Sequence, residues 1–387
     1  MAYVAVSGGK EAIEESIKLL DFYKSGTDKD IEIEAIENKM SLLVDRVMSE
    51  AGLYSKTYAA LALKQCEGSI EEAVFLLRAY RSTLTRNYYT NTVNSEEMRV
   101  IRRISAAFKD IIGGQILGAT YDYTHRLINF DIDNDNPAEL RQKILTSLAI
   151  QIPEVLSPLP RVSDELKKEG LIDNHEKNDQ SPYDVTVNML EFPTDRSARL
   201  QTLSRADTGF ISGLAYSALR GFGQVHPTVG ELRCGYVELC VPYLSGWSQT
   251  QNDAFAARPC NRDENESIYI GEILITEVEC FNSADDKNQL KLAVGYGAVF
   301  GRNETKAISM AVIDRELDNG GDYPTQNEEF VLMHGDSLEM NGFISHLKLP
   351  HYVTFQSKLD TVRKTRLVVQ QETLNCSPKH PGRQNNE

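Results

Sequence analysis

The sequence predicts an α+β fold in which a mainly helical N-terminal domain over residues 1–130 is followed by a mixed strand and helix domain over residues 191–370. Two observations predict it. Apolar residues recur at helical spacing in about the first 110 residues, and later stretches alternate apolar with polar residues as strands do. Because the strands do not alternate with helices, an α+β arrangement is favoured over a parallel βαβ array. The polar residues 131–190 predict a linker with short helices, and residues 371–387 predict a disordered tail.

Three helices are predicted in the N-terminal domain. The first ends near Gly52, a residue type that suits the position after a helix. Its apolar stripe consists of Ile36, Met40, Leu43, Val44, Val47 and Met48. The second begins at Ser69, which has the form of a capping box with Glu72. Ser95 is predicted to cap the third helix, whose inward side chains would be Ile101, Ile104 and Phe108.

The second domain is predicted to contain strands over Gly235–Val241, Ile268–Cys280 and Leu292–Val299, because apolar and polar residues alternate there. A helix is predicted over Thr305–Leu317. Between the first two strands, Ser245–Glu266 is rich in Asn, Gln, Asp and Ser, so we expect a surface loop.

The composition restricts the function classes. The chain has 387 residues and a formal net charge of −15, which repels nucleic acid and anionic membranes. The acidity fits simple solubility, or an anionic substrate whose basic ligands are gathered locally. No signal-type segment and no apolar run near the ~20 residues that cross a bilayer is present, so we expect a cytoplasmic protein. Its six cysteines, none in a Cys-x-x-Cys motif, are expected to be reduced thiols.

A histidine pair is the candidate metal site. His346 and His351 are five residues apart, so they share neither a helical face nor one side of a straight strand. Pro350 breaks both structures, and a bend there would bring the imidazoles together. Two histidines do not complete a zinc site, which takes four ligands or three and a water. The missing ligands would come from His334 or Asp336, a partner subunit, substrate or water; a chance pair would look the same.

Two groups of residues are candidates for binding phosphate. Gly295–Gly301 lacks both the Walker and the dinucleotide pattern, but it leads into the predicted helix at Thr305, so it is either a helix N-terminus that binds an anion or a structural turn. Basic residues that follow the linker suit a polyphosphate, or are solvated residues on a helix. The candidate substrate-binding residues are Arg196, Arg199, Arg220 and Lys306.

Four carboxylates are candidates for acid–base chemistry or for stabilising an oxocarbenium-like centre: Glu231, Glu277, Glu279 and Asp336, which we expect to be free. No Ser-His-Asp or Cys-His signature is recognisable.

Several segments together resemble one family, the I subunit of the bacterial carbon–phosphorus lyase core complex. They are Val44–Met48, Phe75–Arg81, Thr120–Arg126, Arg220–Gly223 with His226-Pro227, Gly295–Gly301, Glu329–Leu332 and the histidine segment Ser345–His351. The resemblance runs from the first residues to about position 360 and departs from the family pattern in the linker, in the loop Ser245–Glu266 and in the tail.

The resemblance implies a transferase that takes part in organic phosphonate catabolism. With G, H and L partners, the family's I subunit displaces adenine from ribose C1 of MgATP with an alkylphosphonate, giving a ribose 1-alkylphosphonate 5-triphosphate. Alone it acts as an ATP nucleosidase, releasing adenine with water as acceptor. The implied partners are subunits G, H and J of the core, with ATPase-like subunits K and L.

The resemblance also implies roles for single residues. His346 and His351 would bind a metal, expected to be zinc, close to the J subunit. Departure of adenine builds positive charge on the ribose, and our own hypothesis is that Glu277 or Asp336 is the catalytic carboxylate that stabilises it. The alternative is a non-catalytic scaffold subunit that binds metal at an interface of the same complex.

Overall fold

The structure is a computed structural model in which the chain divides into two compact units, one formed by Ile31–Leu338 and the other by Met1–Asp30 with Glu339–Glu387. It describes residues 9–26, 30–130, 132, 136–147, 159–173, 182–242, 267–283, 291–349 and 351–375. This division differs from the predicted domain boundaries, because both ends of the chain belong to one unit.

The larger unit begins with a bundle of four helices whose core is apolar. They are α2 (Ile33–Lys39), α3 (Ser41–Ala51), α4 (Lys56–Gln65) and α5 (Ile70–Thr83). The predicted stripe is confirmed in this core for Val44, Val47 and Met48, which are buried, but is wrong for Met40, which is exposed. The stripe lies on two helices, because α2 ends at Lys39 and α3 begins at Ser41. Gly52 follows α3 with φ +62°, as predicted, and Ser69 Oγ accepts a hydrogen bond from Glu72 N at the start of α5.

An antiparallel four-stranded sheet follows the bundle, with its strands in chain order. They are β1 (Arg99–Ile104), β2 (Thr228–Pro242), β3 (Ser267–Ser283) and β4 (Leu292–Phe300). The three predicted strands are therefore confirmed.

The helix predicted from Ser95 is wrong. Only the 3₁₀ turn η1 (Ser95–Glu97) forms there, and β1 follows it and pairs with β2. Val100, Ile101 and Ile104 are β-branched and suit a strand, and β2 supplies the backbone partners that a single sequence does not reveal.

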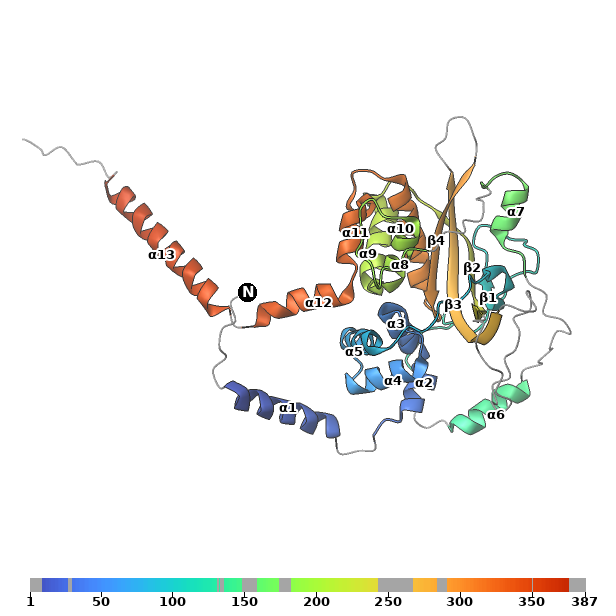
Figure 1. Ribbon diagram of the computed structural model, residues 1–387, viewed down its shortest axis with the longest axis horizontal. Helices are drawn as coiled ribbons and strands as arrows, with labels where there is room; N and C mark the ends of the chain where they lie inside the picture. Colours follow the sequence, from blue (N-terminus) through green and yellow to red (C-terminus); the bar gives the residue numbers. More distant parts are fainter. Residues whose placement is uncertain are drawn as a thin grey trace, which may run out of the picture. The chain divides into compact units, whose positions relative to one another are not determined.

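Helices cover both faces of the sheet (Figure 1). On one face lie α8 (Arg196–Arg205), α9 (Thr208–Ser217), α10 (Glu304–Asn319) and α11 (Glu328–His334), with the short turns η2 (Ala218–Phe222) and η3 (Pro324–Gln326). The main core lies between these helices and the sheet and includes Leu232, Val278 and Val299. On the other face lies α7 (Val162–Lys168), and α6 (Pro137–Ser147) is an exposed helix of the predicted linker.

Two glycines of β4 let α10 lie directly on the sheet. A Cβ at Gly295 would lie 2.2 Å from the carbonyl oxygen of Ala311, and one at Gly297 would lie 2.2 Å from that of Ala307. These distances are shorter than any van der Waals contact. The glycines of Gly295–Gly301 therefore serve helix–sheet packing, which favours the structural alternative for this stretch.

The second unit contains α1 (Gly9–Ser25), most of α12 (Ser337–Ser345), the 3₁₀ turn η4 (His346–Lys348) and α13 (Tyr352–Asn375). α13 extends into the range predicted to be a disordered tail. The predicted loop Ser245–Glu266 lies outside the described residues. The strands on either side of it, β2 and β3, are described.

Two expectations about the whole chain can be compared with the described residues. None of the helices described is long and apolar enough to span a membrane. Cys66, Cys234 and Cys280 form no disulfide, but Cys240 is disulfide-bonded, so the expectation of six reduced cysteines is wrong for that residue.

The packing of α10 on β4 predicts that Gly297→Ala lowers the free energy of unfolding by about 1–3 kcal/mol, the usual cost of overpacking. Urea denaturation would measure it. Gly213→Ala in α9 is the matched control: a Cβ there meets nothing within 4 Å, so this helical glycine should gain about 0.5–1 kcal/mol. Equal stabilities of the two variants would contradict the close approach.

Candidate functional site

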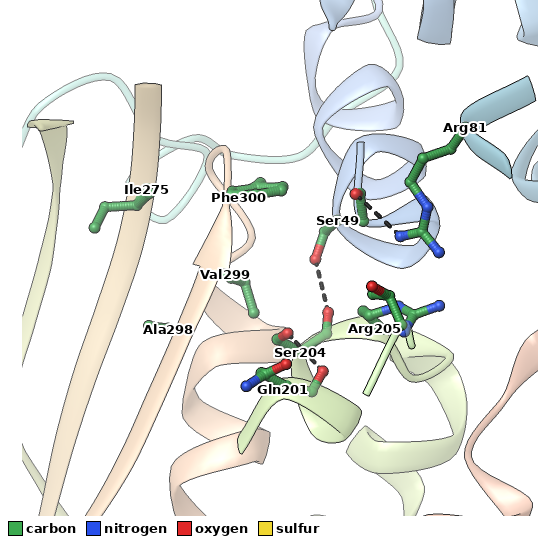
Figure 2. A pocket seen from close by; sticks show the side chains of 11 residues that line it. Ser49, Arg81, Gln201, Ser204, Arg205, Ile275, Ala298, Val299 and Phe300 are labelled. Atoms are coloured by element: carbon green, nitrogen blue, oxygen red, sulfur yellow. Dashed lines mark hydrogen bonds between the residues drawn. The ribbon is translucent and has the colours of Figure 1, made fainter. Parts of the chain in front are cut away.

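The larger unit contains a cavity of about 250 Å³ between the ends of α3, α5 and α8 and strands β3 and β4. Figure 2 shows Arg81 and Arg205 on one side of it and Ile275, Val299 and Ala298 on the other. The cavity thus has a cationic wall and an apolar wall. Both are made by residues of one compact unit.

The two arginines converge on Gly52. A Cβ at this glycine would lie 2.8 Å from Arg81 Nη1 and 3.3 Å from Arg205 Nε, and its φ of +62° also favours glycine. Arg81 donates hydrogen bonds to the carbonyl oxygens of Ala51 and Gly52 at 3.2 and 3.3 Å, which caps the C-terminus of α3. Burial and the nearby Arg78 lower the pKa of Arg81.

The burial of Arg205 is less well compensated by hydrogen bonds than that of Arg81. Its Nε is buried and has no hydrogen-bond partner among the described residues. Burial, followed by the positive charges of Arg78 and Arg81, lowers the pKa of Arg205 to about 10, so the guanidinium still carries its charge at neutral pH. The cationic wall therefore contains positive charge that the surrounding protein disfavours.

Asp336, one of the two predicted catalytic residues, lies beside this wall. It forms an ion pair with Arg78, which also donates to the carbonyl oxygens of Glu50 and Arg205, at 2.7 and 3.2 Å. Its other carboxylate oxygen accepts from the backbone N–H of Leu338 at 2.8 Å. The expectation of a free carboxylate is wrong here, because Arg78 already engages it.

Lys306, a predicted substrate ligand, lies directly behind the cavity. It is fully buried on α10, and its Nζ donates to Ser49 Oγ at 3.0 Å. Ser49 lines the cavity and donates in turn to the carbonyl oxygen of Ser204 at 3.1 Å. Burial lowers the pKa of Lys306 from 10.5 to about 7, although Glu50 partly opposes the shift. Lys306 therefore reaches the cavity only through Ser49.

The carboxylates on the opposite face of the sheet are also engaged. Arg103 Nε lies 2.5 Å from a Glu231 oxygen, and Arg233 Nε lies 2.9 Å from a Glu277 oxygen. Tyr296 donates its hydroxyl to the second Glu277 oxygen at 3.0 Å. Glu277 is almost fully buried, so the expectation of free carboxylates is wrong for this pair as well.

Glu279 differs from its neighbours. It accepts a hydrogen bond from Ser163 at 3.0 Å, and Arg161 lies 4.0 Å away, but its second oxygen has no partner among the described residues. Burial raises the pKa of Glu279 to about 7, with Glu277 and Glu231 adding to the shift. A buried carboxyl poised near neutrality is a candidate acid or base.

The predicted arginine cluster is only partly exposed. Asp314 holds Arg196 at 2.6 Å and Arg199 at 2.8 Å, and Arg199 is buried. The alternative of solvated arginines on a helix is therefore wrong for Arg199. Arg220 is exposed, on the turn η2. The contact of these residues with a polyphosphate stays a prediction.

The histidine pair belongs to the smaller unit. The ring centroids of His346 and His351 lie 5.3 Å apart, with the ring planes at 72°; His346 is half-buried and His351 is exposed. His346 Nδ1 contacts the carbonyl oxygen of Phe343. Pro350, which was expected to bend the chain, lies outside the described residues. In the described parts of the chain, no group of three or more His, Cys, Asp or Glu gathers to hold a metal.

No pattern in the sequence marked the cavity. Its walls come from segments that lie far apart along the chain, and Arg81 stood out only within a family motif. Arg205 lies close to Arg196 and Arg199 in the sequence, but its lack of an anionic partner among the described residues shows only in the fold.

Comparison with known proteins identifies the family. The family model described as "Bacterial phosphonate metabolism protein (PhnI)" matches residues 2–369. HtxH of Stutzerimonas stutzeri is 42% identical over 381 residues, covering 95% of this chain and 96% of HtxH. The alpha-D-ribose 1-methylphosphonate 5-triphosphate synthase subunit PhnI of Escherichia coli strain K12 is 41% identical, covering 94% and 98% of the two chains. Its namesake from Rhizobium meliloti strain 1021 is 41% identical, covering 94% and 95%.

The buried Lys306 predicts a pH-dependent stability. Because its folded-state pKa lies below the ordinary 10.5, the unfolded chain binds more protons between pH 7 and 10.5, and stability rises with pH in that window. Lys306→Met should remove more than about 1 kcal/mol of this rise, since one pKa unit corresponds to about 1.4 kcal/mol. Urea denaturation at several pH values measures it. The exposed Lys109→Met is the control, and identical slopes for both variants would refute the shift.

Proposed function

The chain belongs to the PhnI family of bacterial phosphonate metabolism proteins, and from that premise we propose that it is a subunit of a carbon–phosphorus lyase complex that transfers the ribose triphosphate of ATP to an alkylphosphonate. In this reaction the bond between ribose C1 and adenine breaks, and a bond from C1 to a phosphonate oxygen forms. The proton of the phosphonate leaves with adenine, so the charges balance. With water in place of the phosphonate, the same subunit is an ATP nucleosidase.

The geometry of the histidine pair carries the proposal. A tetrahedral zinc ion bound at about 2.1 Å by one nitrogen of each of two imidazoles sets the ring centroids roughly 5 Å apart. The observed 5.3 Å fits a shared ion. A zinc ion bound there would supply a Lewis acid with open positions for phosphate oxygens.

The surroundings of His346 also fit a metal ligand. A carbonyl oxygen only accepts hydrogen bonds, so His346 Nδ1 must carry the proton that it donates to Phe343. This contact fixes the tautomer and leaves Nε2 as the nitrogen with a free electron pair, the arrangement found around most ligating histidines. Two ligands do not complete a zinc site, so a partner subunit, substrate or water supplies the rest.

The other predicted residues would act through their charges. Glu277 and Asp336 are each held by an arginine, and an ionised carboxylate of this kind would stabilise positive charge on the ribose as adenine departs. The exposed Arg220 is the candidate ligand for the triphosphate of MgATP. The proposed partners are subunits G, H and J, with the ATPase-like K and L.

One observation favours the second candidate function, a scaffold that binds metal without performing the chemistry. Glu231, Glu277 and Asp336 are all engaged by arginines in the chain itself. Ion pairs of this kind also serve stability alone. Catalysis would then belong to a partner subunit.

Adenine release distinguishes the two functions. The purified chain, alone and with its partner subunits, is incubated with MgATP with or without methylphosphonate, and free adenine is quantified by chromatography. We expect free adenine both with and without methylphosphonate. In the complex, we also expect a bond between methylphosphonate and ribose C1. Release that persists undiminished in a complex carrying both Glu277→Ala and Asp336→Ala would exclude these carboxylates, and no release from any assembly would favour the scaffold.

The metal assignment is tested separately by metal content. His346→Ala should lower the zinc retained by the purified complex about tenfold or more, because one of the two ligands that this chain supplies is lost. His226→Ala is the control, because His226 is an exposed histidine of the larger unit that the proposal does not use as a ligand. Equal zinc in wild type and His346→Ala would sink the assignment.

A further inference from the structure

The cationic wall of the cavity carries charge that no ion pair among the described residues neutralises. Arg81 and Arg205 have no carboxylate at ion-pair distance there, and the negative charges of Asp336 and Asp184 act on Arg205 only from a greater distance, because these residues pair with Arg78 and Arg86. Arg81 donates from Nη1 to two backbone carbonyl oxygens, and the buried Nε of Arg205 has no hydrogen-bond partner among the described residues.

Such an arrangement is unusual in a folded protein. A partly buried positive charge costs free energy unless it is paired, and removing the partner of a buried pair is strongly destabilising. Elsewhere on α8 the rule is obeyed, since Arg196 and Arg199 share the buried carboxylate of Asp314. At the end of the same helix, Arg205 has no such partner among the described residues, which points to a bound anion.

The hydroxyl groups that line the cavity already donate hydrogen bonds within the protein. Ser49 bridges Lys306 and a carbonyl oxygen, Ser204 donates to the carbonyl oxygen of Gln201, and Thr186 donates to Asp184. Recognition of a ligand in this cavity therefore rests on the guanidinium groups. Paired guanidinium donors bind tetrahedral oxyanions such as phosphate and phosphonate particularly well.

The opposite wall limits what the rest of the ligand is. Ile275, Ala298, Val299 and Phe300 give it an apolar surface, and the Phe300 ring is fixed by an edge-to-face contact with Tyr54, with centroids 5.5 Å apart. At about 250 Å³ the cavity is smaller than the roughly 300–1,000 Å³ of ordinary ligand pockets, which favours a small ligand. A small anion with one short apolar substituent matches both walls.

We propose that this cavity is the binding site for a short-chain alkylphosphonate, with the phosphonate oxygens on Arg81 and Arg205 and the alkyl group against Phe300 and Val299. The inference rests on the proposed function, which makes a phosphonate the co-substrate. It adds the place of binding and the origin of selectivity: charge holds the head group, and the apolar wall distinguishes an alkylphosphonate from inorganic phosphate.

Binding of methylphosphonate to the full chain, measured by titration calorimetry and by ³¹P NMR line broadening, tests the cationic wall. Arg205→Gln and Arg81→Gln should each weaken binding about tenfold or more, the usual effect of losing a charge-assisted hydrogen bond. Arg99→Gln is the control. It removes the same positive charge from β1, where Arg99 pairs with Glu272 away from the cavity. Should Arg205→Gln not fold, Arg205→Lys keeps the charge, removes the forked donor and is expected to bind several-fold more weakly than wild type.

The apolar wall is tested with inorganic phosphate as a second probe. Wild type should prefer methylphosphonate several-fold, and Phe300→Leu should reduce this preference while binding phosphate as before. Equal affinity of wild type for the two anions would overturn the assignment to an organic phosphonate. Wild-type affinity in both Arg→Gln variants would overturn the site itself.

Failure of this site and failure of the proposed function give different results. Adenine release by wild type, combined with unchanged methylphosphonate binding in Arg205→Gln, would refute the site and leave the function standing. Loss of binding in Arg205→Gln, combined with no adenine release from any assembly, would support the site and refute the transfer reaction.

Discussion

Helix α10 lies so close to β4 that the carbonyl oxygens of Ala307 and Ala311 occupy the space where side chains at Gly297 and Gly295 would be. The rest of the larger unit depends on this contact. A helix pressed into the sheet is surrounded on every side, so its polar residues are buried along with its apolar ones. Lys306, Asp314 and Glu316 are all inaccessible to solvent. Each needs a partner from another segment, because an unpaired buried charge is costly.

Those partners arrange the segments around α10. Asp314 holds Arg196 and Arg199 and so fixes α8. Glu316 accepts hydrogen bonds from the backbone N–H of Val225 at 3.1 Å and from Gln326 at 2.9 Å, which ties two loops to the helix. Lys306 reaches Ser49 at 3.0 Å and fixes the end of α3. Arg205 lies at the end of α8, and α8 and α3 line the cavity opposite the sheet. Because α10 fixes both helices, the position of Arg205 follows from the packing of α10.

The sequence made the regular elements predictable and left the site hidden, for identifiable reasons. The three long strands and α10 could be predicted because their apolar residues recur at strand or helix spacing. The start of α5 could be predicted because Ser69 caps it locally. β1 was mistaken for a helix because its partner strand lies more than a hundred residues away. The carboxylates looked free for the same reason: Arg103 and Glu231 meet only across the sheet. Pairing between distant residues leaves no trace in a single sequence.

The two candidate sites differ in how complete they are. His346 and His351 supply two ligands, so a metal there needs further ligands. The residues that line the cavity with Arg81 and Arg205 all belong to one compact unit. A complete pocket binds its ligand before assembly, whereas an incomplete metal site acquires full coordination only when partner or substrate arrives. Phosphonate binding should therefore depend on this chain alone, and chemistry at the metal should depend on assembly.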